Sequence, residues 1–279
     1  MMQDHDPLGR ALVLADEGDW AGVAELLREE VDDEPSAEVL CWLGVAEREL
    51  GMPGIAYERF KQALAQDPQD PVVLATAGNA LAAFDDPDAE PALRAAAMLG
   101  RDVALARWMY GAYLTREGML AEARAELDAA VELAPDDPVV RYESAVWSLV
   151  SGRTGDGIAG LARAAELDSE DGWTRVVLGL AMIDDERLDE AFVELEAGAR
   201  LRDDDVEAQL LAALAAAAEG YDDAAFEMVE RARMRAEGTD VLTVNEVEER
   251  MHDSPEAARR FLVSTLAPTA LRERLATRP

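Results

Sequence analysis

Apolar and polar residues alternate along this chain with the spacing of amphipathic helices. Helical stretches of this kind surround Phe60, Leu127, Leu161 and Leu195, and an acidic turn follows each of them. Leu127, Leu161 and Leu195 are spaced 34 residues apart, and Phe60 precedes Leu127 by 67 residues, which is 34 plus 33. A fixed period near 34 residues predicts a stack of helix-turn-helix repeats.

Prolines mark the starts of these predicted helices. In the stretch 133–147, LAPDDPVVRYESAVW, apolar residues at helical spacing run up to two prolines and resume directly after them. Asp70-Pro71 and Asp137-Pro138 have the order of an N-cap followed by a proline in the first helical position. Each of these prolines therefore begins a helix.

The sequence departs from the period in two places. Residues 85–91, DDPDAEP, put Pro91 inside an expected second helix, which predicts a local irregularity or a bend. Near the C-terminus Ser254 and Pro255 read as an N-cap and first helical position, so we expect residues 254–279 to form capping helices.

The repeated residues resemble the tetratricopeptide repeat (TPR) family. Residues 37–70 fit its pattern best, through Leu43, Gly44, Gly51, Ala56, Phe60, Ala63 and Pro68. Residues 104–137 fit almost as well, through Gly111, Gly118, Ala123, Leu127, Ala130 and Pro135. Similar units start near residues 4, 37, 71, 104, 138, 172, 206 and 240. The resemblance implies an all-α solenoid of about eight repeats, a single domain over residues 1–279 that winds as a right-handed superhelix with a concave face.

Charge narrows the choice of partners. The 59 acidic and 26 basic residues give a formal charge of -33 and a pI near 4.2, so nucleic acid and anionic membranes are excluded as partners. The N-terminus is acidic where a signal peptide would be basic, and the longest uncharged apolar run, 210–218, is too short to span a bilayer. A single cysteine, Cys41, fits a reducing compartment. We expect a soluble, cytoplasmic protein.

Few residues are candidates for catalysis or metal binding, and they lie far apart in the sequence. His5 and His252 are far apart, and Cys41 has no histidine placed to activate it. Acidic runs such as 203–205 lack the alternating ligands of a calcium loop. The sequence therefore predicts a protein that is not an enzyme and has no cofactor or metal.

The TPR resemblance implies which side chains face the hollow of the superhelix. From about residue 105 to 214 these positions are largely apolar, and apolar surface of this kind usually marks a binding site. Two alternatives remain open: a groove free for a partner, or a stripe already covered by a tightly wound superhelix or by the C-terminal helix. The predicted groove residues are Trp108, Ala112, Arg116, Tyr142, Val146, Leu149, Trp173, Val176, Leu180, Ile183, Leu210 and Leu214.

Three arginines, Arg107, Arg141 and Arg175, recur one period apart. They form either a basic ladder that holds carboxylates of a partner or pairs within their own helices, with Asp137 and Asp171 four residues before Arg141 and Arg175.

Two functions fit these observations. The first is a non-catalytic adaptor whose concave groove binds an apolar or amphipathic segment of another protein, with a basic partner favoured by the acidic surface. The second is a self-associating scaffold, because residues 254–279 carry five arginines and two glutamates while the remainder of the chain is strongly acidic.

Overall fold

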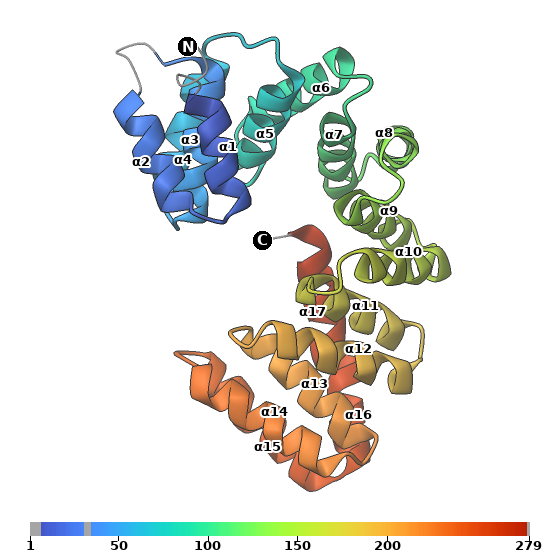
Figure 1. Ribbon diagram of the computed structural model, residues 1–279. Coiled ribbons are helices and arrows are strands. Elements are labelled where there is room, and N and C mark those ends of the chain that lie inside the picture. Colours follow the sequence, from blue (N-terminus) through green and yellow to red (C-terminus); the bar gives the residue numbers. More distant parts are fainter. Residues whose placement is uncertain (1–6, 31–34, 278–279) are drawn as a thin grey trace. The chain divides into compact units, whose positions relative to one another are not determined.

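The computed structural model describes residues 7–30 and 35–277 (Figure 1), and these residues contain helices and turns but no strand. The first helices are α1 (Pro7–Asp16), α2 (Trp20–Glu30), α3 (Ala37–Glu49), α4 (Pro53–Leu64), α5 (Pro71–Ala82), α6 (Ala89–Leu99), α7 (Ala104–Arg116) and α8 (Leu120–Leu133). They are followed by α9 (Pro138–Val150), α10 (Thr154–Leu167), α11 (Gly172–Asp184), α12 (Leu188–Leu201), α13 (Val206–Ala218), α14 (Asp222–Arg235) and α15 (Asp240–Asp253). The last elements are α16 (Pro255–Phe261), the π-helical segment η1 (Leu262–Leu266) and α17 (Ala267–Ala276).

The helices pack in consecutive pairs, α1 with α2, α3 with α4, and so on through α15 with α16. About eight helix pairs in an all-α arrangement confirm the predicted fold class. The chain divides into two compact units, residues 1–133 with α1–α8 and residues 134–279 with α9–α17. The assignment of all repeats to one solenoid domain stays a prediction.

Aspartates cap the first helix of several pairs. The Asp70 carboxylate accepts a hydrogen bond from the Val72 amide at 2.7 Å, and Asp137 accepts bonds from Val139 and Val140 at 2.8 and 3.1 Å. Pro71 and Pro138 follow in the first helical turn, where a proline costs no intrahelical hydrogen bond. The predicted function of these prolines as helix starts is confirmed.

Small residues set the distance between the two helices of a pair. A Cβ atom added to Gly44 would lie 2.9 Å from the ring of Phe60, and one added to Gly179 would lie 2.7 Å from Leu195. In both pairs a glycine on the first helix receives a large, fully buried side chain from the second. The helices therefore approach more closely than any larger residue at these positions would allow.

Helix α6 runs without interruption through Pro91, where the sequence predicts a local irregularity or a bend. Helix α6 begins at Ala89, so Pro91 occupies the third position of the first turn, where an amide has no partner within the helix. Asp85 in the preceding loop has a φ of +52°, and this conformation is regular in the fold, because Gly51, Gly118 and Glu186 at the corresponding position of other repeats also have positive φ values.

The C-terminal segment consists of α16, η1 and α17. Ser254 caps α16 by accepting a hydrogen bond from the Ala257 amide at 3.1 Å. Within η1 the Ala267 amide bonds to the Leu262 carbonyl, five residues earlier. Pro268 follows and has no amide hydrogen to continue the ordinary helical ladder, which accounts for the wider turn at this point.

Candidate functional site

The C-terminal segment packs against the first helices of two earlier pairs. Within unit 134–279, α17 contacts α11 while α16 and η1 contact α13, and Figure 1 shows α17 beside α11. The shared apolar cluster includes Ala258, Leu262, Ala267 and Ala270 of this segment. These four side chains are at most 3% exposed. The segment is thus part of the hydrophobic core of its unit.

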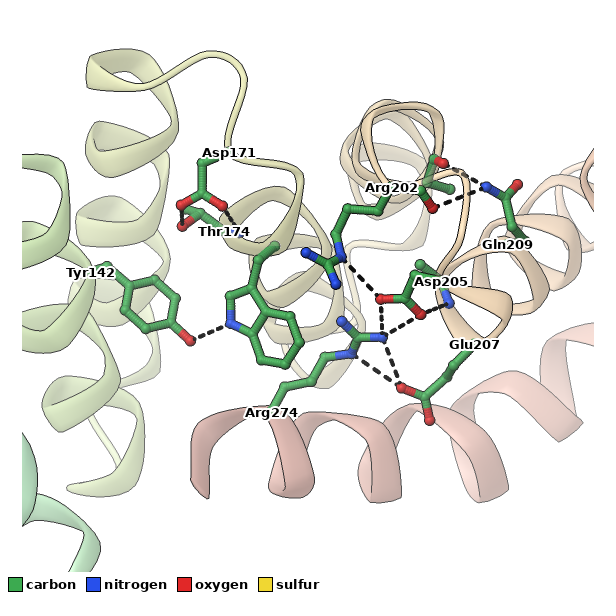
Figure 2. Close-up of polar contacts among 11 residues, drawn as sticks. Tyr142, Asp171, Thr174, Arg202, Asp205, Glu207, Gln209 and Arg274 are labelled. Carbon is green, nitrogen blue, oxygen red and sulfur yellow. Dashed lines mark hydrogen bonds and ion pairs between the residues drawn. The ribbon is translucent and has the colours of Figure 1, made fainter. Parts of the chain in front are cut away.

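A buried arginine anchors α17 at its far end. Arg274 is 5% exposed, and its Nη2 atom donates to both carboxylate oxygens of Asp205 at 2.9 and 3.0 Å. Its Nε and Nη2 atoms also donate to Oε2 of Glu207, at 3.1 and 3.0 Å. Figure 2 shows Arg274 extending from α17 toward both carboxylates of the opposite helix. Charge-assisted bonds of this kind are stronger than neutral ones.

An aromatic ring completes the anchor. The guanidinium carbon of Arg274 lies 4.6 Å from the centroid of the Trp173 ring, and that of Arg202 lies 5.4 Å from the same centroid. The indole Nε1 of Trp173 donates to the buried hydroxyl of Tyr142 at 2.9 Å, which fixes the orientation of the ring. Trp173 therefore presents its π-surface to two cations.

Asp205 has three partners. Its carboxylate caps α13 by accepting from the Ala208 amide at 2.9 Å, and it also accepts from Arg202 Nε at 3.2 Å besides Arg274. Burial opposes ionisation of Asp205, but the charge of Arg274 and the hydrogen bonds outweigh it and lower the pKa of this carboxyl below its ordinary value. Asp205 is thus a carboxylate at neutral pH. We call Trp173, Asp205 and Glu207 the α17 docking face.

Most of the predicted groove residues of unit 134–279 are buried. The C-terminal segment packs on α11 and α13, which carry several of these residues. Both alternatives left open by the sequence, a groove free for a partner and a covered stripe, stay predictions. Trp173 is half-buried beneath the C-terminal segment. The fully buried residues of the prediction in this unit are Tyr142, Val146, Val176, Leu180, Ile183, Leu210 and Leu214.

Two predicted groove residues point toward their own pairs instead. A Cβ atom added to Gly157 would lie 2.5 Å from the Leu149 side chain, so Leu149 packs against α10. A Cβ atom added to Gly198 would lie 2.7 Å from the Val176 side chain, so Val176 packs against α12. In both cases a glycine on the second helix leaves room for the neighbouring side chain. Their assignment to the groove stays a prediction.

Unit 1–133 contains the remaining predicted groove residues. On α7, Trp108 is half-buried, Ala112 is buried and Arg116 is exposed. Binding of a partner at these residues stays a prediction.

The side chains of Arg107, Arg141 and Arg175 form hydrogen bonds with the backbone of the turns between repeats. Their Nε atoms each donate to the carbonyl oxygen six residues earlier, from Arg107 to Arg101 at 3.5 Å, from Arg141 to Pro135 at 2.6 Å and from Arg175 to Ser169 at 3.4 Å. Arg107 also pairs with Glu126, and Arg175 with Glu194, each nineteen residues later on the second helix of the same pair. Arg107 and Arg175 thus pair with the second helix of their own repeat. The pairs within one helix, with Asp137 and Asp171, and a ladder for partner carboxylates both stay predictions.

The residues considered for chemistry lie apart. Cys41 is buried, and burial together with the charge of Asp70 raises the pKa of its thiol to about 12. His252 is exposed, and His5 lies outside the described residues. Over residues 7–30 and 35–277, no three His, Cys, Asp or Glu side chains gather as a metal site would require. In the same ranges no helix has both the length and the apolar character needed to cross a membrane.

Comparison with solved structures identifies the fold. A chain of the APC/C hetero-tetramer Cut9–Hcn1 superposes with a TM-score of 0.72 at 19% identity, over 90% of this chain and 50% of that one. This chain therefore spans half the length of that relative. TTC0263, a thermophilic TPR protein of Thermus thermophilus, superposes with a TM-score of 0.52 at 26% identity, over 63% of this chain and 97% of that one. The chain has the TPR fold. No protein-family model matches the sequence, and a comparison with curated proteins finds no significant match.

The TPR resemblance located Trp173 but missed the residues that hold α17 against it. Arg274, Asp205 and Glu207 are not among the positions that the repeat pattern assigns to the groove. One signal pointed to Arg274: the positive local charge of residues 254–279 in an otherwise acidic chain. Asp205 carried a second signal as an N-cap, but its pairing with Arg274 depends on tertiary contacts alone.

Proposed function

We propose that this TPR protein is a non-catalytic adaptor that binds an amphipathic helical segment of another protein on the α17 docking face. TPR folds generally mediate protein–protein interactions. The observation that carries the proposal is that an amphipathic helix, α17, already packs on Trp173, Asp205 and Glu207. A face with this complementarity is suited to a partner helix of similar chemistry.

Charge supports a basic partner. Asp205 and Glu207 present two carboxylates on the docking face, and the whole chain has a formal charge of -33. Such a field accelerates the approach of a positively charged segment and disfavours acidic ones. Binding should therefore weaken as salt concentration rises.

A selection experiment tests this function. A displayed library of helical peptides is selected for binding to the full chain. The affinity of each selected peptide is then measured for the wild-type chain and for the Trp173→Ala variant. We expect a loss of at least tenfold, which corresponds to about 1.4 kcal/mol. Phe226→Ala is the matched control, because Phe226 is an aromatic residue 65% exposed on α14. If the peptides bind the Trp173→Ala and Phe226→Ala variants with equal affinity, the binding site lies elsewhere and the proposal is refuted.

Self-association is the second candidate, favoured by the same contact. If α17 of one molecule docked on Asp205 and Glu207 of another, the two chains would exchange their C-terminal segments. Light scattering of the wild-type chain against the Arg274→Glu variant tests this. A wild-type dimer that becomes a monomer in the variant would support it, and a wild-type monomer at all concentrations would exclude it.

A further inference from the structure

We propose, building on the adaptor function above, that α17 is a displaceable internal ligand, and that the partner helix carries an arginine in the place of Arg274. The face of α17 that meets α11 and α13 has the pattern A-x-x-A-L-x-x-R-L over residues 267–275. Ala267, Ala270 and Arg274 are its buried members, and Leu271 and Leu275 are partly buried beside them. The proposal assigns this pattern to the partner helix.

Each position of the pattern has a physical function in the contact. The alanines are one turn apart on the same side of α17, and their small size lets the helix lie close to the core. The arginine supplies two carboxylate contacts and one cation–π contact at once. A lysine could not reproduce this arrangement, because an ammonium group has no planar fork to bridge two carboxylates while stacking on a ring.

The contact is also incomplete, which favours exchange. The Nη1 atom of Arg274 is buried and has no hydrogen-bond partner among the described residues. A buried donor without a partner opposes docking of α17. Glu207, for its part, is half-exposed, so one side of the anchor is open to solvent. A partner helix that satisfies the arginine fully has an advantage over α17.

A break in the regular helical hydrogen bonding lies between α16 and α17. The π-helical segment η1 and Pro268 interrupt the regular hydrogen-bond ladder between α16 and α17. Helix α16 is fixed by the buried side chain of Ala258 and by that of Leu262, which directly follows the helix. Helix α17 can therefore leave α11 while α16 stays on α13.

The test uses the full chain and a fluorescent peptide with the sequence of residues 262–279. Arg274→Glu in the chain should release α17 by placing a third carboxylate beside Asp205 and Glu207. We expect the peptide to bind this variant at least tenfold more tightly than it binds the wild-type chain, measured by fluorescence anisotropy. Arg272→Glu is the matched control, because it makes the same charge change on an exposed position of the same helix, and it should bind as the wild type does.

The peptide itself provides the second comparison. The same peptide with Arg274→Glu or Arg274→Lys should bind the Arg274→Glu chain at least tenfold more weakly than the original peptide. Circular dichroism establishes that the chain variants keep their helical content. Equal binding by the three chains, or by the three peptides, would overturn the proposal.

A measurement on the wild-type chain does not depend on any variant folding. An excess of unlabelled peptide should increase hydrogen exchange at residues 269–276 as α17 is displaced, while α16 stays protected. Exchange that the peptide leaves unchanged would overturn the proposal, as would a wild-type dimer that the peptide converts to monomers, because the occupant would then be a second copy. If library peptides bind through Trp173 without needing an arginine, the adaptor function stands and only this inference fails.

Discussion

Arg274 stacks on the indole ring of Trp173, with 4.6 Å between the guanidinium carbon and the ring centroid, although the two residues stand far apart in the sequence. The same guanidinium bonds to Asp205 and Glu207. One side chain of the last helix thus touches both an aromatic residue of α11 and the start of α13.

The contact should depend on pH through Asp205. The pKa of Asp205 is lowered in the folded chain, so its contribution to stability is present above its ordinary value near 4 and is lost as the pH falls through the lowered value. Asp205→Asn keeps a good N-cap but removes the charge. We expect this variant to be less stable than the wild type by about 1–3 kcal/mol at pH 7, with the difference shrinking toward pH 2.

Urea unfolding at several pH values measures this difference. Asp204→Asn, an exposed neighbour, should show little difference from the wild type at any of them. A gap for Asp205→Asn that is independent of pH would show that the pair with Arg274 does not stabilise the fold electrostatically.

Phe60 is a packing residue of unit 1–133. It is 1% exposed and lies against Gly44 across the α3–α4 pair. Phe60→Ala should lower the free energy of unfolding by about 3–5 kcal/mol, because it removes buried apolar surface and leaves a cavity. Chemical denaturation measures the loss, and Phe226→Ala on the exposed face of α14 should change stability by less than about 0.5 kcal/mol. Similar values for the two variants would contradict the packing described here.

Gly179 has no room for a larger side chain. A Cβ atom would lie 2.7 Å from Leu195 and 3.0 Å from the Ala191 carbonyl oxygen, and backbone cannot move aside easily. Gly179→Ala should therefore destabilise the chain by about 1–3 kcal/mol. Gly155→Ala is the opposite case, because nothing lies within 4 Å of its Cβ position in α10, and it should stabilise by about 0.4–1 kcal/mol. Thermal unfolding followed by circular dichroism distinguishes the signs.

Cys41 should be inert in the folded protein. Burial, with the nearby charge of Asp70, raises the pKa of its thiol to about 12, so almost no thiolate exists at pH 8. We expect an aromatic disulfide reagent to react with the native chain at least a hundredfold more slowly than with the chain in denaturant. Fast reaction under native conditions would mean that the α3–α5 region opens readily.

Arg175 and Glu194 should interact more strongly than a surface pair. Their side chains are both about four-fifths buried, and the Nη1–Oε2 distance is 3.0 Å. A double-mutant cycle with alanine should give a coupling energy of about 0.5–1 kcal/mol. The exposed pair Arg124–Asp128, measured in the same way, should give less than about 0.5 kcal/mol.

The sequence by itself determined the repeat, because the period and the helix caps are local features. Helical spacing predicted the helices, and Asp70 and Asp137 identified two of their starts. These features depend on contacts within one or two turns or between neighbouring helices, so a linear pattern contains them. The net charge of the chain likewise follows from the sequence alone.

Tertiary structure decided which face is covered. The repeat pattern predicts an apolar stripe but does not predict that α17 packs on α11. Helix α17 is not part of a repeat, and several helices separate it from α11 along the sequence. Leu149 and Val176 turned inward for a related reason, since the space that accepts them is created by a glycine on another helix. Arg274 is buried only because Asp205, Glu207 and Trp173 converge on it, and burial of a charge depends on all of its partners together.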